Sequence, residues 1–219
     1  MSEPRKGING MKILFQGDSV TDSGRDRSDY HDLGTGYAKF AAAMISDAFR
    51  DTEIEFINLG ISANRTSHLI ERLQSDFVDI APDLVILLIG VNDVWHHYDA
   101  KNVQTTAEQF EFNLRTVLEA IRSTGAKLVM LEPYMMYGSN KDFMYEELDE
   151  KIRIERALAH EYADAYVPLH ALFAAETVSK PYTTFSPDGV HPNTDGAAFI
   201  AQRVFDAALP ILEELANGD

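Results

Sequence analysis

Short apolar segments alternate with longer helix-like segments along most of this chain. Five apolar runs of strand length are found at residues 12–15, 54–59, 84–89, 127–131 and 165–167. The first four are rich in Val, Ile, Leu or Phe without strict alternation, which is typical of strands that are covered on both faces. Each run is followed by a segment with helical spacing of its apolar residues, at residues 37–49, 67–80, 107–122, 145–162 and 195–215.

This alternation predicts an α/β fold with three layers. Connections from strand through helix to strand are right-handed and give a parallel sheet with helices on both faces. The last helix is expected to be capped by Asn193 or Thr194. Because no repeat, low-complexity tract or linker divides the chain, we predict one domain over residues 1–219, with residues 1–10 as a poorly ordered N-terminal tail.

Composition narrows the classes of function. The chain has 219 residues, with 19 Lys and Arg against 35 Asp and Glu, and the net charge of −16 argues against nucleic acid and anionic membranes as partners. The absence of Cys excludes a disulfide scaffold, a thiol nucleophile and a Cys-ligated metal. The N-terminus leads into no apolar segment of the secretory type, so we expect a cytoplasmic location with no membrane span.

A candidate nucleophile follows the first predicted strand. Open α/β sheets bind ligands at the carboxyl ends of their strands, and the strand at 12–15 runs into Gly17-Asp18-Ser19. A glycine lets the chain turn tightly there, so that the Ser19 hydroxyl can project above the sheet edge. Two other interpretations stay open at this point, a loop that only caps the next helix and an anion-binding loop.

A candidate base lies near the C-terminus, in the loop before the last helix. Asp188 and His191 are three residues apart in a turn that is rich in Gly and Pro. This spacing allows a carboxylate to bind one imidazole nitrogen while the other nitrogen faces a serine hydroxyl, which needs such a base to become nucleophilic. The alternative is a capping turn with a surface histidine. His160 and His170 are expected at ordinary helix-end or surface positions.

Candidate oxyanion donors follow the second and third predicted strands. Gly60 can turn its N–H toward a substrate, and the side-chain amide of Asn92 can donate to an oxygen. With the Ser19 N–H they would supply three donors to a tetrahedral oxyanion. Each of these residues could instead be a simple loop former.

Taken together and in this order, the motifs resemble the SGNH hydrolase superfamily, also called GDSL-type esterases. The matching segments are Gly17-Asp18-Ser19, Gly60, Gly90-Val91-Asn92-Asp93 and Asp188-Gly189-Val190-His191, within a resemblance that covers residues 12–210. The resemblance implies a flavodoxin-like sheet of five parallel strands and hydrolysis of esters without a metal or organic cofactor. It also implies that Ser19 is the nucleophile, His191 the base and Asp188 its orienting carboxylate. Ser19, Gly60 and Asn92 would then form the oxyanion hole.

One segment departs from the family pattern. Many members have Ser-Gly-x-Thr where this chain has Ser62-Ala63-Asn64-Arg65. We expect this difference to reshape the pocket wall and to leave Gly60 in place. Asp18 and Asp93 are expected to brace their loops.

A smaller group within the superfamily is more similar still. Leu33-Gly34-Thr35-Gly36-Tyr37, Gly90-Val91-Asn92-Asp93-Val94-Trp95 and Tyr98-Asp99 are similar to intracellular acetylxylan esterases. That resemblance implies removal of acetyl groups from xylo-oligosaccharides by a homo-oligomer. The tentative substrate contacts are Asp18, Tyr37, Trp95 and Tyr98. The polar loop at 22–37, which could shape its own or a neighbouring subunit's site, is unlike the apolar lid that a long acyl chain requires.

We therefore predict a serine esterase that acts on small acylated molecules, with acetylated sugars as the expected substrates. A lysophospholipase or thioesterase of the same superfamily is one alternative. A non-catalytic, flavodoxin-like anion-binding module is another.

Overall fold

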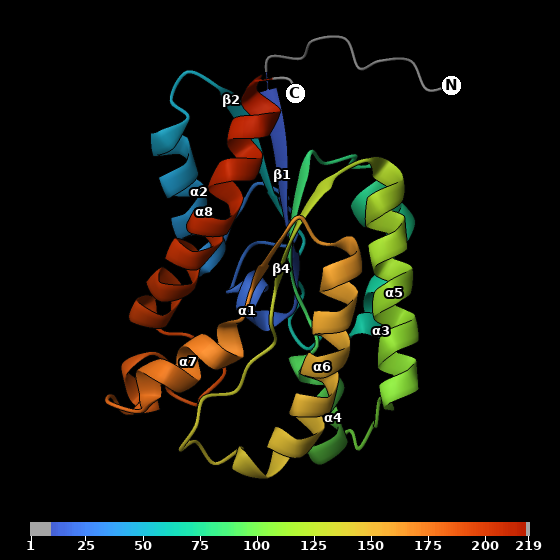
Figure 1. Cartoon of the computed structure of the whole chain (residues 1–219), viewed down its shortest axis with the longest axis vertical. Coiled ribbons are helices and arrows are strands. Elements are labelled where there is room, and N and C mark those ends of the chain that lie inside the picture. The colour runs from blue at the N-terminus through green and yellow to red at the C-terminus, as the bar shows by residue number, and fades with distance from the viewer. Residues whose placement is uncertain (1–9, 218–219) are drawn as a thin grey trace.

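The computed structural model describes residues 10–217, and its centre is a parallel sheet of five strands (Figure 1). The strands are β1 (Gly10–Gly17), β2 (Glu53–Asn58), β3 (Leu84–Leu88), β4 (Lys127–Leu131) and β5 (Ala165–Val167). They are ordered β2-β1-β3-β4-β5, and every neighbouring pair is parallel, which confirms the predicted flavodoxin-like sheet. The expected N-terminal tail lies outside the described residues except for Gly10, which begins β1.

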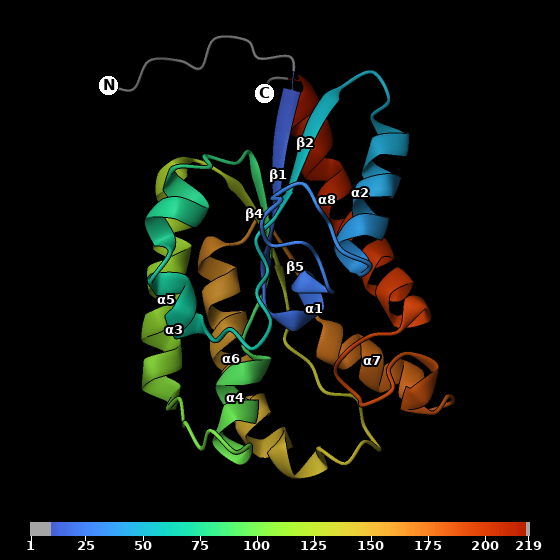
Figure 2. The same ribbon diagram turned by 180° about the vertical axis from the view of Figure 1, so that it is seen from behind.

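Helices cover both faces of this sheet. Those longer than one turn are α2 (Tyr37–Ala48), α3 (Thr66–Ile70), α4 (Val91–Tyr98), α5 (Ala107–Thr124), α6 (Tyr145–Tyr162), α7 (Leu169–Thr177) and α8 (Thr194–Asn217). In Figures 1 and 2, α2 and α8 lie side by side on one face, and α3, α5 and α6 cover the other. None of the helices in residues 10–217 is both long and apolar enough to cross a bilayer.

The continuous apolar character of the strands reflects two cores, one on each face. Along β1, Ile13 and Phe15 pack into the core under α2 and α8, whereas Leu14 points into the core under α5. Along β3, Leu84 and Ile86 pack into the first of these cores, and Val85 and Leu87 pack into the second. Since both sets of side chains are buried, the sequence of these strands shows no polar face.

The helix boundaries agree with the predicted ones except in three places. The segment 67–80 is not one helix, because α3 is followed by a π-helical turn, Gln74–Val78, in which the buried Asp76 accepts hydrogen bonds from Gln16 Nε2 and Arg72 Nε. The short helices α4 and α7 were not predicted. At the start of α8, Asn193 is the cap, since its Oδ1 accepts the N–H of Gly196 at 3.0 Å.

The strand order creates a crevice where the expected site residues follow the strands. Connections leave β1 and β3 in opposite directions along the sheet, and ligands bind at such switch points beyond the carboxyl ends of the strands. The turn after β1 carries Ser19, and the turn after β3 carries Asn92. The topology therefore brings two distant motifs to one edge.

Candidate active site

Ser19 is presented by a sharp turn between β1 and the single-turn helix α1 (Ser19–Asp22). A Cβ atom on Gly17 would lie 2.2 Å from the Leu88 carbonyl oxygen and 2.5 Å from Thr21 Oγ1, so only glycine fits where the turn begins. Asp18 caps the helix, because its Oδ1 accepts the Val20 N–H at 3.0 Å. The turn thereby places the Ser19 hydroxyl at the carboxyl edge of the sheet.

The structure brings Ser19 together with the predicted Asp188 and His191, from the other end of the chain. Ser19 Oγ lies 2.9 Å from His191 Nε2, and His191 Nδ1 lies 2.8 Å from Asp188 Oδ2. The second carboxylate oxygen, Asp188 Oδ1, accepts the backbone N–H groups of Val190 at 3.0 Å and His191 at 2.8 Å. Asp188 therefore holds both its own loop and the orientation of the imidazole.

These contacts shift the pKa values of Asp188 and His191 in opposite directions. Partial burial acts to raise the pKa of the Asp188 carboxyl, but the hydrogen bonds from His191 and from two backbone amides outweigh it and leave that pKa well below its ordinary value. The hydrogen bond with Asp188 in turn raises the pKa of His191 above 6.5, against the opposing effect of desolvation. Asp188 is thus ionised at neutral pH and stabilises an imidazolium on His191.

Gly60 was expected to be an oxyanion donor, and here the structure corrects the prediction. The Gly60 N–H donates to Asn58 Oδ1 at 2.9 Å, and Gly60 does not line the pocket around Ser19. The residue packs tightly instead, since a Cβ there would lie 2.6 Å from the Asp22 backbone nitrogen. Its N–H is therefore already used inside the protein.

Ala63, three residues later, occupies the position that was expected for Gly60. It lines the pocket together with Ser19 and Asn92, and its N–H has no acceptor among the described residues. Its φ of 68° is in the left-handed region that favours glycine. The signal was present in Ser62-Ala63-Asn64-Arg65, because Ala63 stands where the family pattern has its glycine.

The loop that carries Ala63 is supported by the polar segment at 22–37. The buried Asp22 accepts hydrogen bonds from the Ser62 backbone at 2.8 Å and from Ser62 Oγ at 2.7 Å. Arg25 Nε donates to the Gly60 carbonyl oxygen at 3.0 Å. None of the pocket-lining residues comes from this segment, so within the chain it supports the donor loop from behind.

Asn92 is the second residue of α4 and lines the same pocket. One hydrogen of its side-chain amide is donated to the Asn64 carbonyl oxygen at 3.1 Å, which fixes the amide and leaves its second hydrogen for a ligand. The neighbouring Asp93 is buried and accepts the backbone N–H of Thr66 at 3.0 Å and Thr66 Oγ1 at 2.7 Å. Asp93 thus ties α4 to α3, as the bracing role requires.

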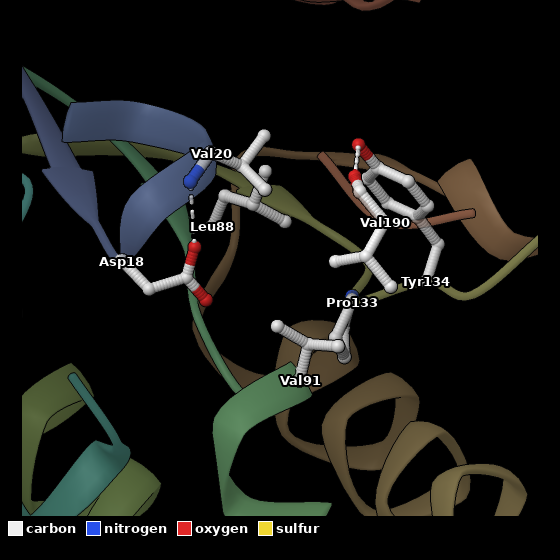
Figure 3. A pocket seen from close by; sticks show the side chains of 7 residues that line it. All are labelled: Asp18, Val20, Leu88, Val91, Pro133, Tyr134 and Val190. Atoms are coloured by element: carbon white, nitrogen blue, oxygen red, sulfur yellow. Dashed lines mark hydrogen bonds between the residues drawn. The ribbon is translucent and has the colours of Figure 1, made fainter. Parts of the chain in front are cut away.

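Two of the four tentative substrate contacts are wrong. Tyr37 has no exposed surface, and its hydroxyl lies 3.0 Å from Thr21 Oγ1 in the core. Asp18 is 1% exposed and faces a void of about 10 Å³ beneath the site, shown in Figure 3, so it braces the turn and does not reach a substrate. Burial raises the pKa of Asp18 to about 7.

The other two tentative contacts lie at or beside the pocket. Trp95 lines it, with its ring centroid 5.8 Å from that of His191. Tyr98 is 43% exposed, lies outside the set of lining residues and packs edge-on against Phe143 at 5.3 Å. Trp95 therefore forms a wall of the site, and Tyr98 lies one helical turn farther out.

The pocket itself is an open depression of about 490 Å³ whose lining has both polar and apolar surface. The lining residues are Ser19, Ser62, Ala63, Asn92, Trp95, His96, Asp99, Lys101 and His191. In the described part of the chain, no group of three or more His, Asp or Glu side chains is arranged to hold a metal ion. The arrangement offers a hydroxyl, a base and hydrogen-bond donors around one space.

One histidine is placed differently from the prediction. His170 lies at the start of α7, which agrees with the expected helix-end position, but it is only 7% exposed and therefore not a surface residue. Its ring packs with those of Tyr137 and Tyr145, at centroid distances of 5.7 Å and 5.9 Å. Burial lowers its pKa, as expected for an imidazole removed from water.

Comparison with known proteins assigns the chain to a family. A profile of the GDSL-like Lipase/Acylhydrolase family matches residues 15–199. The chain therefore belongs to this family, also known as the SGNH hydrolases, and it is a carboxylic ester hydrolase. The predicted resemblance to this superfamily is confirmed.

Particular relatives narrow the comparison. The acetylxylan esterase of Geobacillus stearothermophilus is 29% identical over 89% of this chain and 92% of its own, and its crystal structure matches with a TM-score of 0.83. A putative GDSL-like lipase from Parabacteroides merdae is 32% identical over 90% of this chain and 94% of its own, with a TM-score of 0.85. Thioesterase 1/protease 1/lysophospholipase L1 of Escherichia coli is 24% identical over 82% of this chain and 81% of its own.

Proposed function

We propose that this protein is a serine esterase in which Ser19 is the nucleophile, His191 the general base and Asp188 the carboxylate that orients it. The observation that carries the proposal is the 2.9 Å contact between Ser19 Oγ and His191 Nε2, with Asp188 on the other ring nitrogen. Catalytic mutants of the Geobacillus acetylxylan esterase replace a serine, an aspartate and a histidine, which supports the same assignment.

The reaction proceeds through an acyl-enzyme. Ser19 Oγ forms a bond with the ester carbonyl carbon as its proton passes to His191 Nε2. The bond to the alcohol oxygen then breaks, and that oxygen takes the proton from His191. A water molecule attacks the acylated Ser19, again giving its proton to His191, and the proton returns to Ser19 Oγ as the acid leaves.

We assign the oxyanion donors to the Ser19 N–H, the Ala63 N–H and the Asn92 amide, with Ala63 in place of Gly60. All three residues line the same pocket. Loss of one such donor typically lowers turnover by roughly 10²–10³-fold. Asn92→Ala should therefore lower kcat by about this factor with a smaller change in KM, and an unchanged kcat would contradict the assignment.

For the substrate, we propose small O-acyl esters and, more specifically, O-acetylated carbohydrates such as xylo-oligosaccharides. Seven of the nine residues that line the pocket have polar or charged side chains, and the similarity to an acetylxylan esterase points in the same direction. A short acyl group and a hydroxyl-rich leaving group suit such a site better than a long alkyl chain. The cytoplasmic location and the homo-oligomeric state stay predictions.

Two measurements test the proposal. A phosphonofluoridate should form one adduct, at Ser19, whereas an anion-binding module would stay unmodified. The pH profile of kcat/KM for p-nitrophenyl acetate should rise with pH through a pKa above 6.5, because Asp188 raises the pKa of the base. Absence of labelling together with absence of turnover would reject a serine esterase.

A second candidate is an acyl hydrolase for longer chains, which the similarity to the Escherichia coli enzyme favours. Rates on p-nitrophenyl esters from C2 to C8 distinguish the two. The rate should fall steeply from C2 to C8 for an acetyl esterase, whereas it should rise for a lysophospholipase-type site. Acetate release from a panel of acetylated sugars then identifies the natural ester.

A further inference from the structure

The loop that carries Asp188 and His191 is held by the segment that follows β4. Three consecutive carbonyl oxygens of the loop accept hydrogen bonds from this segment. Lys141 Nζ donates to the Asp188 carbonyl at 2.6 Å, the Met136 N–H donates to that of Gly189 at 2.8 Å, and the Tyr134 hydroxyl donates to that of Val190 at 2.8 Å. We call these three donors the loop clamp.

Lys141 is the charged member of the loop clamp, and it also contacts Trp95. Its ammonium lies 4.7 Å from the centroid of the Trp95 ring and 3.2 Å from Asn140 Oδ1. Trp95 is in turn the pocket wall beside His191. One side chain therefore connects the backbone of the Asp188 loop with the aromatic wall of the pocket.

The environment of Lys141 is unusual for a lysine. The residue is 7% exposed, and no carboxylate of the described residues lies within 4.0 Å of its nitrogen. The other buried lysine, Lys151, pairs with Glu147 at 3.2 Å. A buried cation without a carboxylate partner destabilises a fold, so its presence beside the site calls for a functional explanation.

We propose that Lys141 is a positioning residue for acyl transfer, which fixes the Asp188 loop and the Trp95 wall so that His191 stays within reach of Ser19. The inference rests on the proposed function. Lys141 acts through the residues that it contacts, since it lies outside the set that lines the pocket. Its contribution is geometric through the hydrogen bond and electrostatic through its charge.

The positive charge of Lys141 predicts a specific change in the pH profile of the reaction. The charged groups with the largest effect on the pKa of His191 are Asp188 and Asp18, which favour the imidazolium, and Lys141, which opposes it. His96, Asp99 and Lys101 line the same pocket. Removing the positive charge of Lys141 should therefore raise the pKa of His191. Because the reaction needs a neutral imidazole, the acid limb of the kcat/KM profile should move to higher pH.

The experiment compares three substitutions of Lys141 in the full chain, assayed with p-nitrophenyl acetate. Lys141→Gln keeps a donor without the charge, Lys141→Met removes both, and Lys141→Arg keeps both. Lys39→Gln, at an exposed position on α2, is the control for the change in net charge. Circular dichroism and thermal unfolding establish that each variant is folded.

We expect the acid limb to move to higher pH in Lys141→Gln and Lys141→Met. We also expect kcat to fall roughly tenfold in Lys141→Met, with KM changed much less, because displacement of the base acts on the chemical step. Lys141→Arg should keep the acid limb at its wild-type position, and Lys39→Gln should leave both the acid limb and kcat unchanged.

An unmoved acid limb in Lys141→Gln, together with a kcat within twofold of wild type, would overturn the inference. If Lys141→Met does not fold, the comparison of Lys141→Gln with Lys141→Arg decides the question alone. Failure of the proposed function gives a different result. In that case the wild-type protein itself shows no turnover that depends on Ser19.

Discussion

The turn that carries Ser19 and the loop that carries His191 meet in space but are held in different ways. The Ser19 turn is fixed by its own backbone and by the core, through the close packing of Gly17 on the β3 backbone and the buried Asp18 cap. The side chains of His191 and Asp188 are 45% and 34% exposed. Their loop depends on the loop clamp, about fifty residues earlier in the chain. The proposed nucleophile is thus positioned by local structure, whereas the proposed base is positioned by tertiary contacts.

The largest expected effect is on turnover, which should fall in variants of both regions, whereas the unfolding midpoint should fall in only one of them. Ser19→Ala should lower turnover by about 10⁴-fold or more with an unchanged unfolding midpoint, because within residues 10–217 the Ser19 hydroxyl forms a hydrogen bond only with His191. Asp188→Ala should also remove most turnover, but its midpoint should fall, since Asp188 Oδ1 accepts two backbone N–H groups. Steady-state kinetics and thermal unfolding measure the two effects. Equal midpoints in these variants would contradict the difference between the two regions.

Substitutions of one glycine in the Ser19 turn and one in the His191 loop test how tightly each region is packed. Gly17→Ala places a Cβ atom against backbone and should cost several kcal/mol, on the order of a severely overpacked core. Gly189→Ala places it 2.5 Å from the Ser139 Cβ at a φ of 86°, and should cost about 1–3 kcal/mol. Ser139→Gly should partly restore Gly189→Ala, whereas no single truncation relieves Gly17→Ala. Urea unfolding checks these values, and the lack of any rescue at Gly189 would show that the contact with Ser139 does not limit that position.

The buried carboxyl under the nucleophile predicts a pH effect on stability. Burial raises the pKa of Asp18 from 3.8 to about 7, so the native state binds one proton more than the unfolded state between these values. Stability from this group is present below about pH 4 and is lost as the pH rises through 7, by a few kcal/mol at most. Asp18→Asn should flatten this decline in urea unfolding at pH 5 and pH 8. The exposed Asp51→Asn is the control and should leave it in place.

The smallest effect concerns Ala63, on the Ser19 side of the pocket. An alanine at a φ of 68° is strained, so Ala63→Gly should stabilise the protein by about 0.5–1 kcal/mol after the greater entropy of the unfolded glycine is included. Turnover should stay within a fewfold of wild type, because the backbone N–H is kept. A loss of stability would mean that the left-handed conformation costs nothing there.

The same difference explains which features could be predicted from the sequence. The strands, their parallel order and the residues Ser19, Asn92, Asp188 and His191 follow from apolar runs and from motifs at the ends of strands. Tyr37 was wrongly expected to contact the substrate, because the sequence gives no sign of the direction in which an aromatic side chain beside a polar segment points. Gly60 was wrongly expected to be a donor because the sequence does not show that its N–H already binds Asn58. Lys141 could not be found, since its role depends on contacts between distant segments.

The bond between Ser19 and His191 joins positions that are 172 residues apart in the chain. During synthesis the nucleophile is made early, and the histidine emerges only after all five strands have been translated. A nascent or truncated polypeptide that lacks the last loop therefore hydrolyses nothing by this route. Under the proposed mechanism, ester cleavage therefore requires that these two distant segments have met in the folded protein.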